Sequence, residues 1–159
     1  MNSLVWVANI LGWPVVHLTI GFVSVRLPSE FFARDNWLTA PRCWETNGRL
    51  YRDWMGIRKW KSLLLDGAPW FGGFAKKKLS ARKTEYLQHF ILETRRAELA
   101  HWCMFACLPI FFLWNPPWAC WVMTAYAVGA NLPCIFAQRY NRLALSRVAQ
   151  SRRRAFAKA

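Results

Sequence analysis

The chain has 159 residues, of which 55% are hydrophobic, and a formal net charge of +14 at pH 7. This length fits a single domain, residues 1–159, and the eleven tryptophans and eleven phenylalanines exclude a disordered tail. An ordinary soluble enzyme is also excluded, because residues 4–25 and 102–137 carry no charge whereas residues 26–98 hold all eight acids. The composition therefore predicts an all-α integral membrane protein.

Residues 4–25 form the first predicted transmembrane helix. About 22 apolar residues are enough to cross a hydrocarbon core of about 30 Å. Pro14 is expected to kink this helix, and His17 lies near its middle. Because no acid is within reach of His17 on its own helix, we expect His17 to pack against a neighbouring helix.

The segment of residues 26–98 is basic and contains five tryptophans: Trp37, Trp44, Trp54, Trp60 and Trp70. Basic residues interleaved with aromatic residues also occur in proteins that bind nucleic acid. Between two membrane spans, however, they are typical of a surface that lies on lipid headgroups. We therefore expect an interfacial, cytoplasmic subdomain that contacts membrane lipid and no nucleic acid.

The C-terminal half predicts two further membrane segments. An apolar stripe at helical spacing predicts a helix over residues 84–96, which continues into a second span at residues 99–114. This span is short, so a re-entrant hairpin is the alternative to a full crossing. An Asn-Pro-Pro turn at residues 115–117 leads into a third span, residues 118–137, and then into a basic tail, residues 138–159. The total is about three transmembrane helices.

The distribution of positive charge predicts the orientation of these spans. Most of the 22 basic residues lie between residues 26 and 96, the others follow residue 137, and the turn at residues 115–117 carries none. Basic segments of membrane proteins stay in the cytoplasm. We therefore expect a multi-pass protein of the cell (inner) membrane, with its N-terminus outside and its C-terminus in the cytoplasm.

Glu98 and His101 are the first candidates for chemistry. They share one face of a helix at the point where this helix enters the second span. A carboxylate beside an imidazole fixes the histidine tautomer and raises its basicity, and ionisable residues at such a depth are functional candidates. His101 is therefore a candidate general base, oriented by Glu98 or Glu93. Alternatively, these acids form surface ion pairs with Arg95 and Arg96 at headgroup level.

Basic residues near the predicted cytoplasmic ends are candidates for binding phosphate. Arginine binds phosphate through two parallel hydrogen bonds, and lysine binds it as a point charge. We expect four such residues to hold phosphate groups: Arg58, Lys61, Arg139 and Arg142. The polar residues expected to support this site are Asp66, Asn131, Gln138 and Asn141.

The five cysteines do not predict a metal site or a disulfide framework. Their number is odd, and they form neither a C-x-x-C motif nor a His/Cys ligand pattern. Four of them lie in apolar runs, where cysteine behaves as a small hydrophobic residue. We therefore expect no metal and no cofactor.

Three pairs of short stretches carry a resemblance to a known family. They are Arg-Lys-Trp-Lys at residues 58–61 with Leu-Asp-Gly at 65–67, Glu-Thr-Arg-Arg-Ala-Glu at 93–98 with His-Trp at 101–102, and Asn-x-Pro at 131–133 with Gln-Arg-Tyr-Asn-Arg at 138–142. Weaker similarity is found at Arg26, Pro28, Gly48 and Trp54. In this order and spacing, residues 26–143 resemble the glycosyl diaponeurosporenoate acyltransferases, small membrane enzymes of staphyloxanthin-type carotenoid synthesis.

The resemblance implies a function for the chain. In that family a fatty acyl group esterifies a sugar hydroxyl of a glycosylated carotenoid acid. The implied activity is thus O-acyl transfer to a lipophilic, glycosylated acceptor, which need not be a carotenoid. The four basic residues are then expected to hold a phosphate-bearing acyl donor, which is a substrate, and to stabilise the developing oxyanion. Acyl-CoA, an acyl carrier protein and a phospholipid are the alternative donors. Residues 68–83 and those after residue 143 match poorly and could set the choice of substrate.

Two other kinds of protein share these sequence features. One is a non-enzymatic subunit of a membrane biosynthetic complex, and the other is a lipid-binding or transport component. Acylation of a glycolipid by the purified protein distinguishes the enzyme from both. Assembly into an oligomer or a larger complex is compatible with each of the three.

Overall fold

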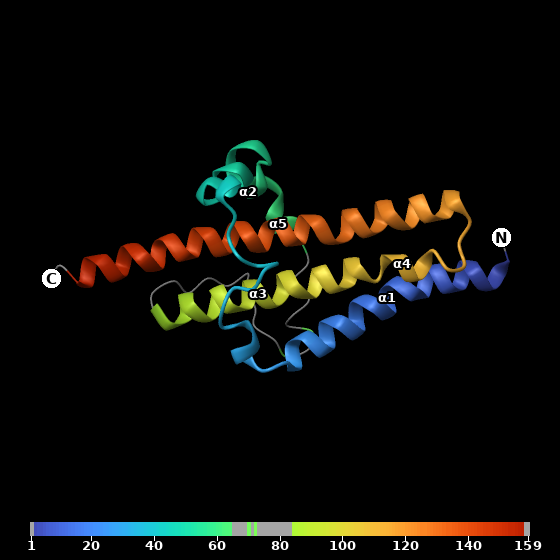
Figure 1. Cartoon of the computed structure of the whole chain (residues 1–159), viewed down its shortest axis with the longest axis horizontal. Coiled ribbons are helices and arrows are strands. Elements are labelled where there is room, and N and C mark those ends of the chain that lie inside the picture. Colours follow the sequence, from blue (N-terminus) through green and yellow to red (C-terminus); the bar gives the residue numbers. More distant parts are fainter. Residues whose placement is uncertain (1, 65–69, 71, 73–83, 158–159) are drawn as a thin grey trace.

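The computed structural model describes residues 2–64, 70, 72 and 84–157, and these residues form helices and turns without any strand. Three long helices lie lengthwise side by side (Figure 1): α1 (Ser3–Arg26), α3 (Thr84–Ala106) and α5 (Pro117–Phe156). Helix α3 packs against both α1 and α5. The predicted all-α fold and the helix over residues 84–96 are thus confirmed.

Prolines set the ends of the long helices. Helix α1 ends at Arg26 because Leu27 precedes Pro28 and adopts an extended conformation, with ψ at 141°. Helix α3 ends at Ala106, and the short helix α4 (Leu108–Phe111) follows with a proline in its first turn. Two consecutive prolines then start α5, where the missing backbone N–H would have no helical partner in any case.

The segment between α1 and α3 forms a series of short helices: η1 (Ser29–Phe32), η2 (Cys43–Gly48), η3 (Leu50–Trp54), α2 (Ile57–Trp60) and η4 (Lys61–Leu63). Helix η1 contacts α3, whereas η2, η3 and η4 lie against α5 (Figure 1). Gly56 precedes α2 with φ at 55°, a conformation that favours glycine. Tyr51 and Ile57 are fully buried against Ala137 and Tyr140 of α5. This packing holds the segment in place beside α5.

A tight contact joins α1 to the turn region after α3. Trp13 stacks on Phe111, with ring centroids 4.4 Å apart and planes 8° apart. A Cβ atom on Gly12 would lie 2.8 Å from a Phe111 ring carbon, so only glycine permits this approach. Asn9 exchanges hydrogen bonds with Asn115 at 2.8 Å. The N-terminal end of α1 is therefore fixed against the turn that precedes α5.

Two of the described helices, α1 and α5, are long and apolar enough to cross a membrane by length and composition. The second predicted span, residues 99–114, is divided between α3 and α4 by a turn at Cys107. A third crossing therefore stays a prediction, and so does the hairpin alternative. Helix α5 is one helix of 40 residues that runs on through the predicted tail to Phe156.

Candidate active site

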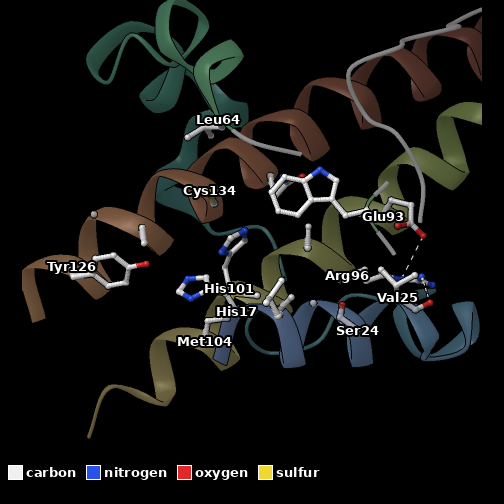
Figure 2. Close-up of a pocket in the computed structure, with 18 of the residues that line it drawn as sticks. His17, Ser24, Val25, Leu64, Glu93, Arg96, His101, Met104, Tyr126 and Cys134 are labelled. Atoms are coloured by element: carbon white, nitrogen blue, oxygen red, sulfur yellow. Dashed lines mark hydrogen bonds and ion pairs between the residues drawn. The ribbon is translucent and has the colours of Figure 1, made fainter. Parts of the chain in front are cut away.

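A cavity of about 500 Å³ lies between the three long helices, with Leu63, Leu64 and Trp70 also on its wall (Figure 2). Much of its lining consists of small and apolar residues: Leu18, Gly21, Ala97, Ala100, Met104, Gly129 and Ala130. Small residues keep the backbones close while leaving room between them. The cavity thus has the character of a site for an apolar chain.

Polar side chains lie at both ends of this cavity. His17 of α1, His101 of α3 and Tyr126 of α5 face the same part of it in Figure 2. Glu93 and Arg96 lie near the C-terminal end of α1. His101 and Glu93 are separated by about 12 Å along the axis of α3, at a rise of 1.5 Å per residue. A substrate of that length can contact both ends.

Asn131 fixes the tautomer of His101. The amide nitrogen of Asn131, which is fully buried, donates to the Ala127 carbonyl at 3.0 Å, so the amide oxygen faces the histidine. Nδ1 of His101 lies 3.1 Å from this oxygen and must be the donor, since the oxygen can only accept. In neutral His101 the basic lone pair is therefore on Nε2.

The tautomer of His17 is fixed in the same way. Its Nδ1 lies 2.8 Å from the backbone carbonyl of Trp13, one turn earlier in α1. A carbonyl only accepts, so Nδ1 donates and Nε2 carries the lone pair. The rings of Trp13 and Tyr126 pack around the imidazole, at centroid distances of 5.7 and 6.1 Å. His17 is thus held rigidly by its surroundings.

Glu98 lies in a buried ion-pair network. Its Oε1 accepts from Arg139 Nε at 2.7 Å, and its Oε2 lies 2.6 Å from Arg142 Nη1. The Glu98 side chain is 0% exposed, and the side chains of the two arginines are 7% and 3% exposed. Glu98 of α3 is thus linked by ion pairs to Arg139 and Arg142 of α5.

The same network extends into the segment of short helices. Arg139 also contacts Glu45 at 2.8 Å and donates to the Leu38 carbonyl, and Arg142 donates to the Thr39 carbonyl at 2.6 Å. Burial and hydrogen bonding to Glu45 raise the pKa of Tyr51 well above its usual value, because its hydroxyl donates to that carboxylate at 2.5 Å. These contacts hold residues 38–51 against α5.

A second, smaller cavity of about 310 Å³ lies between α2, η4 and α5. Arg58 and Lys61 line it together with Asn141 and Tyr140. Lys61 donates to Asn141 at 2.9 Å and lies 5.0 Å from the centre of the Tyr140 ring. Burial, and then the positive charge of Arg58, lower the pKa of Lys61. An anionic ligand would relieve this repulsion.

Comparison with known proteins assigns the chain to a family. A model of the glycosyl-4,4'-diaponeurosporenoate acyltransferases matches residues 28–151. The acyltransferase of that name from Staphylococcus aureus (strain USA300) is 33% identical over 138 residues, which cover 86% of this chain and 82% of the relative. The corresponding protein of Staphylococcus haemolyticus (strain JCSC1435) is 32% identical over 142 residues, or 88% and 82% of the two chains.

The chain belongs to the glycosyl-4,4'-diaponeurosporenoate acyltransferase family. The family resemblance in the sequence is thereby confirmed, and the chain is an acyltransferase of a family named for carotenoid biosynthesis. No solved structure matches the chain.

The residues expected at the site of this acyltransferase fall into three groups in the described structure. His101 and Glu93 line the large cavity with Gln138, and Asn131 contacts His101. Arg58, Lys61 and Asn141 line the small cavity. Glu98, Arg139 and Arg142 form the buried network. Asp66 lies outside the described residues, so its role stays a prediction.

The structure gives Glu98 and His101 different neighbours from those expected. Nδ1 of His101 contacts Asn131, whereas the Glu98 carboxylate lies against two arginines and the Trp102 indole nitrogen at 3.4 Å. Each of them contacts a residue of α5, which their common helix face alone does not predict. The surface pair of Arg95 and Glu98 is not formed either: Arg95 pairs with Asp35 at 2.6 Å.

Two residues of the large cavity were not identified as candidates from the sequence. The sequence predicts that His17 packs against another helix, and it places Tyr126 within the third apolar span. Both are polar groups in the uncharged segments of the chain. Their position in these segments could have identified them as candidates, because polar groups at membrane depth tend to face cavities.

Proposed function

We propose that this protein transfers a fatty acyl group to a hydroxyl of a glycosylated, lipophilic acceptor at the cytoplasmic face of the membrane. The observation that carries the proposal is the hydrogen bond between His101 Nδ1 and Asn131, which leaves the lone pair on Nε2. His101 lines a largely apolar cavity. The names of the relatives support a glycosylated carotenoid acid as the acceptor class.

In the proposed reaction, Nε2 of His101 takes the proton from the acceptor hydroxyl. The hydroxyl oxygen attacks the acyl carbonyl of an activated donor, a thioester or an ester, and a new ester bond forms. The bond between the acyl carbon and the donor heteroatom breaks, and His101 returns the proton to that leaving group. No covalent acyl-enzyme is required. Asn131 takes the orienting role that the sequence suggested for Glu98 or Glu93.

The cytoplasmic rim of the cavity offers further polar contacts to a substrate. The Arg96 guanidinium donates to the Val25 carbonyl at 3.1 Å and lies 3.5 Å from Glu93, so it closes this end between α1 and α3. The Oε1 atom of Gln138 is buried, and among the described residues no hydrogen-bond partner is found for it. A substrate hydroxyl would satisfy this oxygen.

For the donor, we propose that Arg58 and Lys61 bind the phosphate groups, with Asn141 holding Lys61 in place. Arg58 is exposed, and Lys61 has an uncharged partner, so both charges are available to an anion. Arg139 and Arg142 are instead proposed to be structural, because their guanidinium groups are buried and engaged by acids and carbonyls. Acyl-CoA fits a site with two cations better than a donor without phosphate.

Replacing both Arg58 and Lys61 with alanine is expected to raise the KM for acyl-CoA by about 100-fold or more, because two charge-assisted hydrogen bonds are lost and each contributes about 1.5–3 kcal/mol. Salt should weaken binding in the parent and have less effect in the double variant. Lys59→Ala is the matched control, since Lys59 is exposed on the same short helix and does not line the cavity. Equal KM values for the three proteins would remove these residues from donor binding.

The proposed function is tested with purified protein, an acyl donor and a glycolipid, with the ester product identified by mass spectrometry. The parent should form the ester, and Gly129→Leu should not, because a Cβ at Gly129 meets nothing within 4 Å and a larger side chain would fill the cavity. Val128→Leu, on the neighbouring exposed position, is the control. Absence of product with the parent would favour a scaffold or a lipid-binding component.

We also propose that the protein is multi-pass, with its N-terminus outside and the basic segments in the cytoplasm. The charge distribution supports this orientation, and so do the two helices long enough to cross. Asn115→Cys should then react with an impermeant thiol reagent from outside the cell, and reaction from the cytoplasmic side alone would contradict the orientation.

A further inference from the structure

His17 projects into the large cavity from the helix opposite His101, and it lies outside the residues that the family model matches. The matched residues begin at residue 28, after the end of α1. His17 lines the cavity with His101 and Tyr126, one residue from each long helix (Figure 2). The step along α1 from His17 to Arg26 is about 13 Å, which places His17 deep in a membrane-spanning helix. A polar side chain at that depth calls for a functional explanation.

The hydrogen bond of His17 decides what it can recognise. Its Nδ1 proton is used by the Trp13 carbonyl, so the neutral ring has only an acceptor, Nε2, to offer a ligand. Such a group cannot stabilise an oxyanion, which needs a donor. Of the groups taking part in acyl transfer, the hydroxyls of the acceptor are the ones that donate. His17 is therefore suited to a hydroxyl.

Trp13 and Tyr126 fix the direction of this acceptor atom. Trp13 is itself anchored, because its ring stacks on Phe111 and its indole nitrogen donates to the Met123 sulfur at 3.3 Å. Tyr126 meets His17 edge-on, with an interplanar angle of 83°. A ring held on both sides is preorganised for binding and loses little entropy when a ligand arrives.

We propose that His17 is a substrate-binding residue that accepts a hydrogen bond from a second hydroxyl of the acceptor, next to the hydroxyl that His101 deprotonates. The two histidines together then recognise a pair of neighbouring hydroxyls, as found on a sugar, and reject a lone alcohol. This inference rests on the proposed function, because His101 is the base in it. It also explains how the enzyme selects a glycosylated acceptor over a simple lipid alcohol.

The test compares two acceptors, an alkyl glucoside and a primary alcohol with the same alkyl chain, in three proteins: the parent, His17→Leu and His17→Gln. Loss of one neutral hydrogen bond should raise the KM of His17→Leu for the glucoside by about tenfold and leave the alcohol unchanged. Glutamine retains an acceptor oxygen, so His17→Gln should recover most of the parent KM. The pH dependence of kcat, set by His101, should be the same in all three.

The kinetics could overturn the proposal in two ways. An equal loss with both acceptors would make His17 structural, and a fall in kcat as large as that of a His101 variant would make His17 the base.

Equilibrium binding of the two probes is measured in parallel. If the parent forms no ester but binds the glucoside more tightly than the alcohol, and His17→Leu abolishes that preference, the proposed function fails while the His17 site stands. Without any preference in the parent, the His17 proposal fails by itself.

Discussion

Replacing His101 with glutamine is expected to lower kcat for acyl transfer by about 10²–10⁴, because a sugar hydroxyl is a poor nucleophile without a positioned base. Glutamine is polar and similar in size to histidine, so it retains a contact with Asn131, but it cannot take a proton at neutral pH. The KM values for donor and acceptor should stay near those of the parent. Steady-state kinetics with purified protein in detergent measures both quantities.

His89→Gln is the matched control for this variant. His89 lies on the same helix, on an exposed position outside the cavity, and its replacement should leave kcat unchanged. Asn131→Leu should lower kcat by less than His101→Gln does. It removes the hydrogen bond that fixes the tautomer of His101, but the basic imidazole is still present. A His101→Gln protein with a kcat within twofold of the parent would exclude His101 as the base.

The helices and the family were accessible from the sequence because the signals for both are local. Uncharged stretches and prolines mark the ends of α1 and the start of α5, and the stripe over residues 84–96 marks α3. The long extension of α5 was less clear, because its last turns carry arginines that read equally well as a polar tail. Tertiary packing of Leu145 on Leu87 and Phe90 stabilises this extension.

The sequence does not predict which residues contact the candidate site residues. Helical periodicity shows that Glu98 and His101 share a face, but it does not show which residues of other helices meet that face. Arg139 and Arg142 reach Glu98 with long side chains, and Asn131 reaches His101, from a helix far away in sequence. The position of His17 opposite His101 depends on the register between α1 and α3, which the sequence leaves undetermined.

The arginines illustrate how the same residue type is used in two ways. Arg58 is exposed beside a cavity, whereas Arg139 is buried and bound to two carboxylates and a backbone carbonyl. Both were equally good phosphate-binding candidates as residues in a sequence. Burial separates them, because a buried guanidinium needs its acids within the fold, and an exposed one is left to bind a ligand.

Glu98→Gln is therefore expected to destabilise the fold by about 3–5 kcal/mol, the typical cost of removing one partner from a buried ion pair. The substitution preserves shape but leaves Arg142 with Asp35 as its remaining acid, and the Arg142 Nε atom is 3.9 Å from that carboxylate. Because the network also holds residues 38–51, their contacts with α5 should loosen first. Denaturant unfolding in detergent, followed by tryptophan fluorescence, measures the loss.

Asp53→Asn provides the control for Glu98→Gln, because it removes the acid of another arginine pair at the same 2.7 Å distance. The side chains of Arg52 and Asp53 are 41% and 50% exposed, so water replaces the lost contact and the unfolding midpoint should hardly move. Similar small shifts for both variants would show that the buried network adds little to stability. If Glu98→Gln instead left the fold intact and abolished transfer, Glu98 would have the chemical role that its spacing from His101 first suggested.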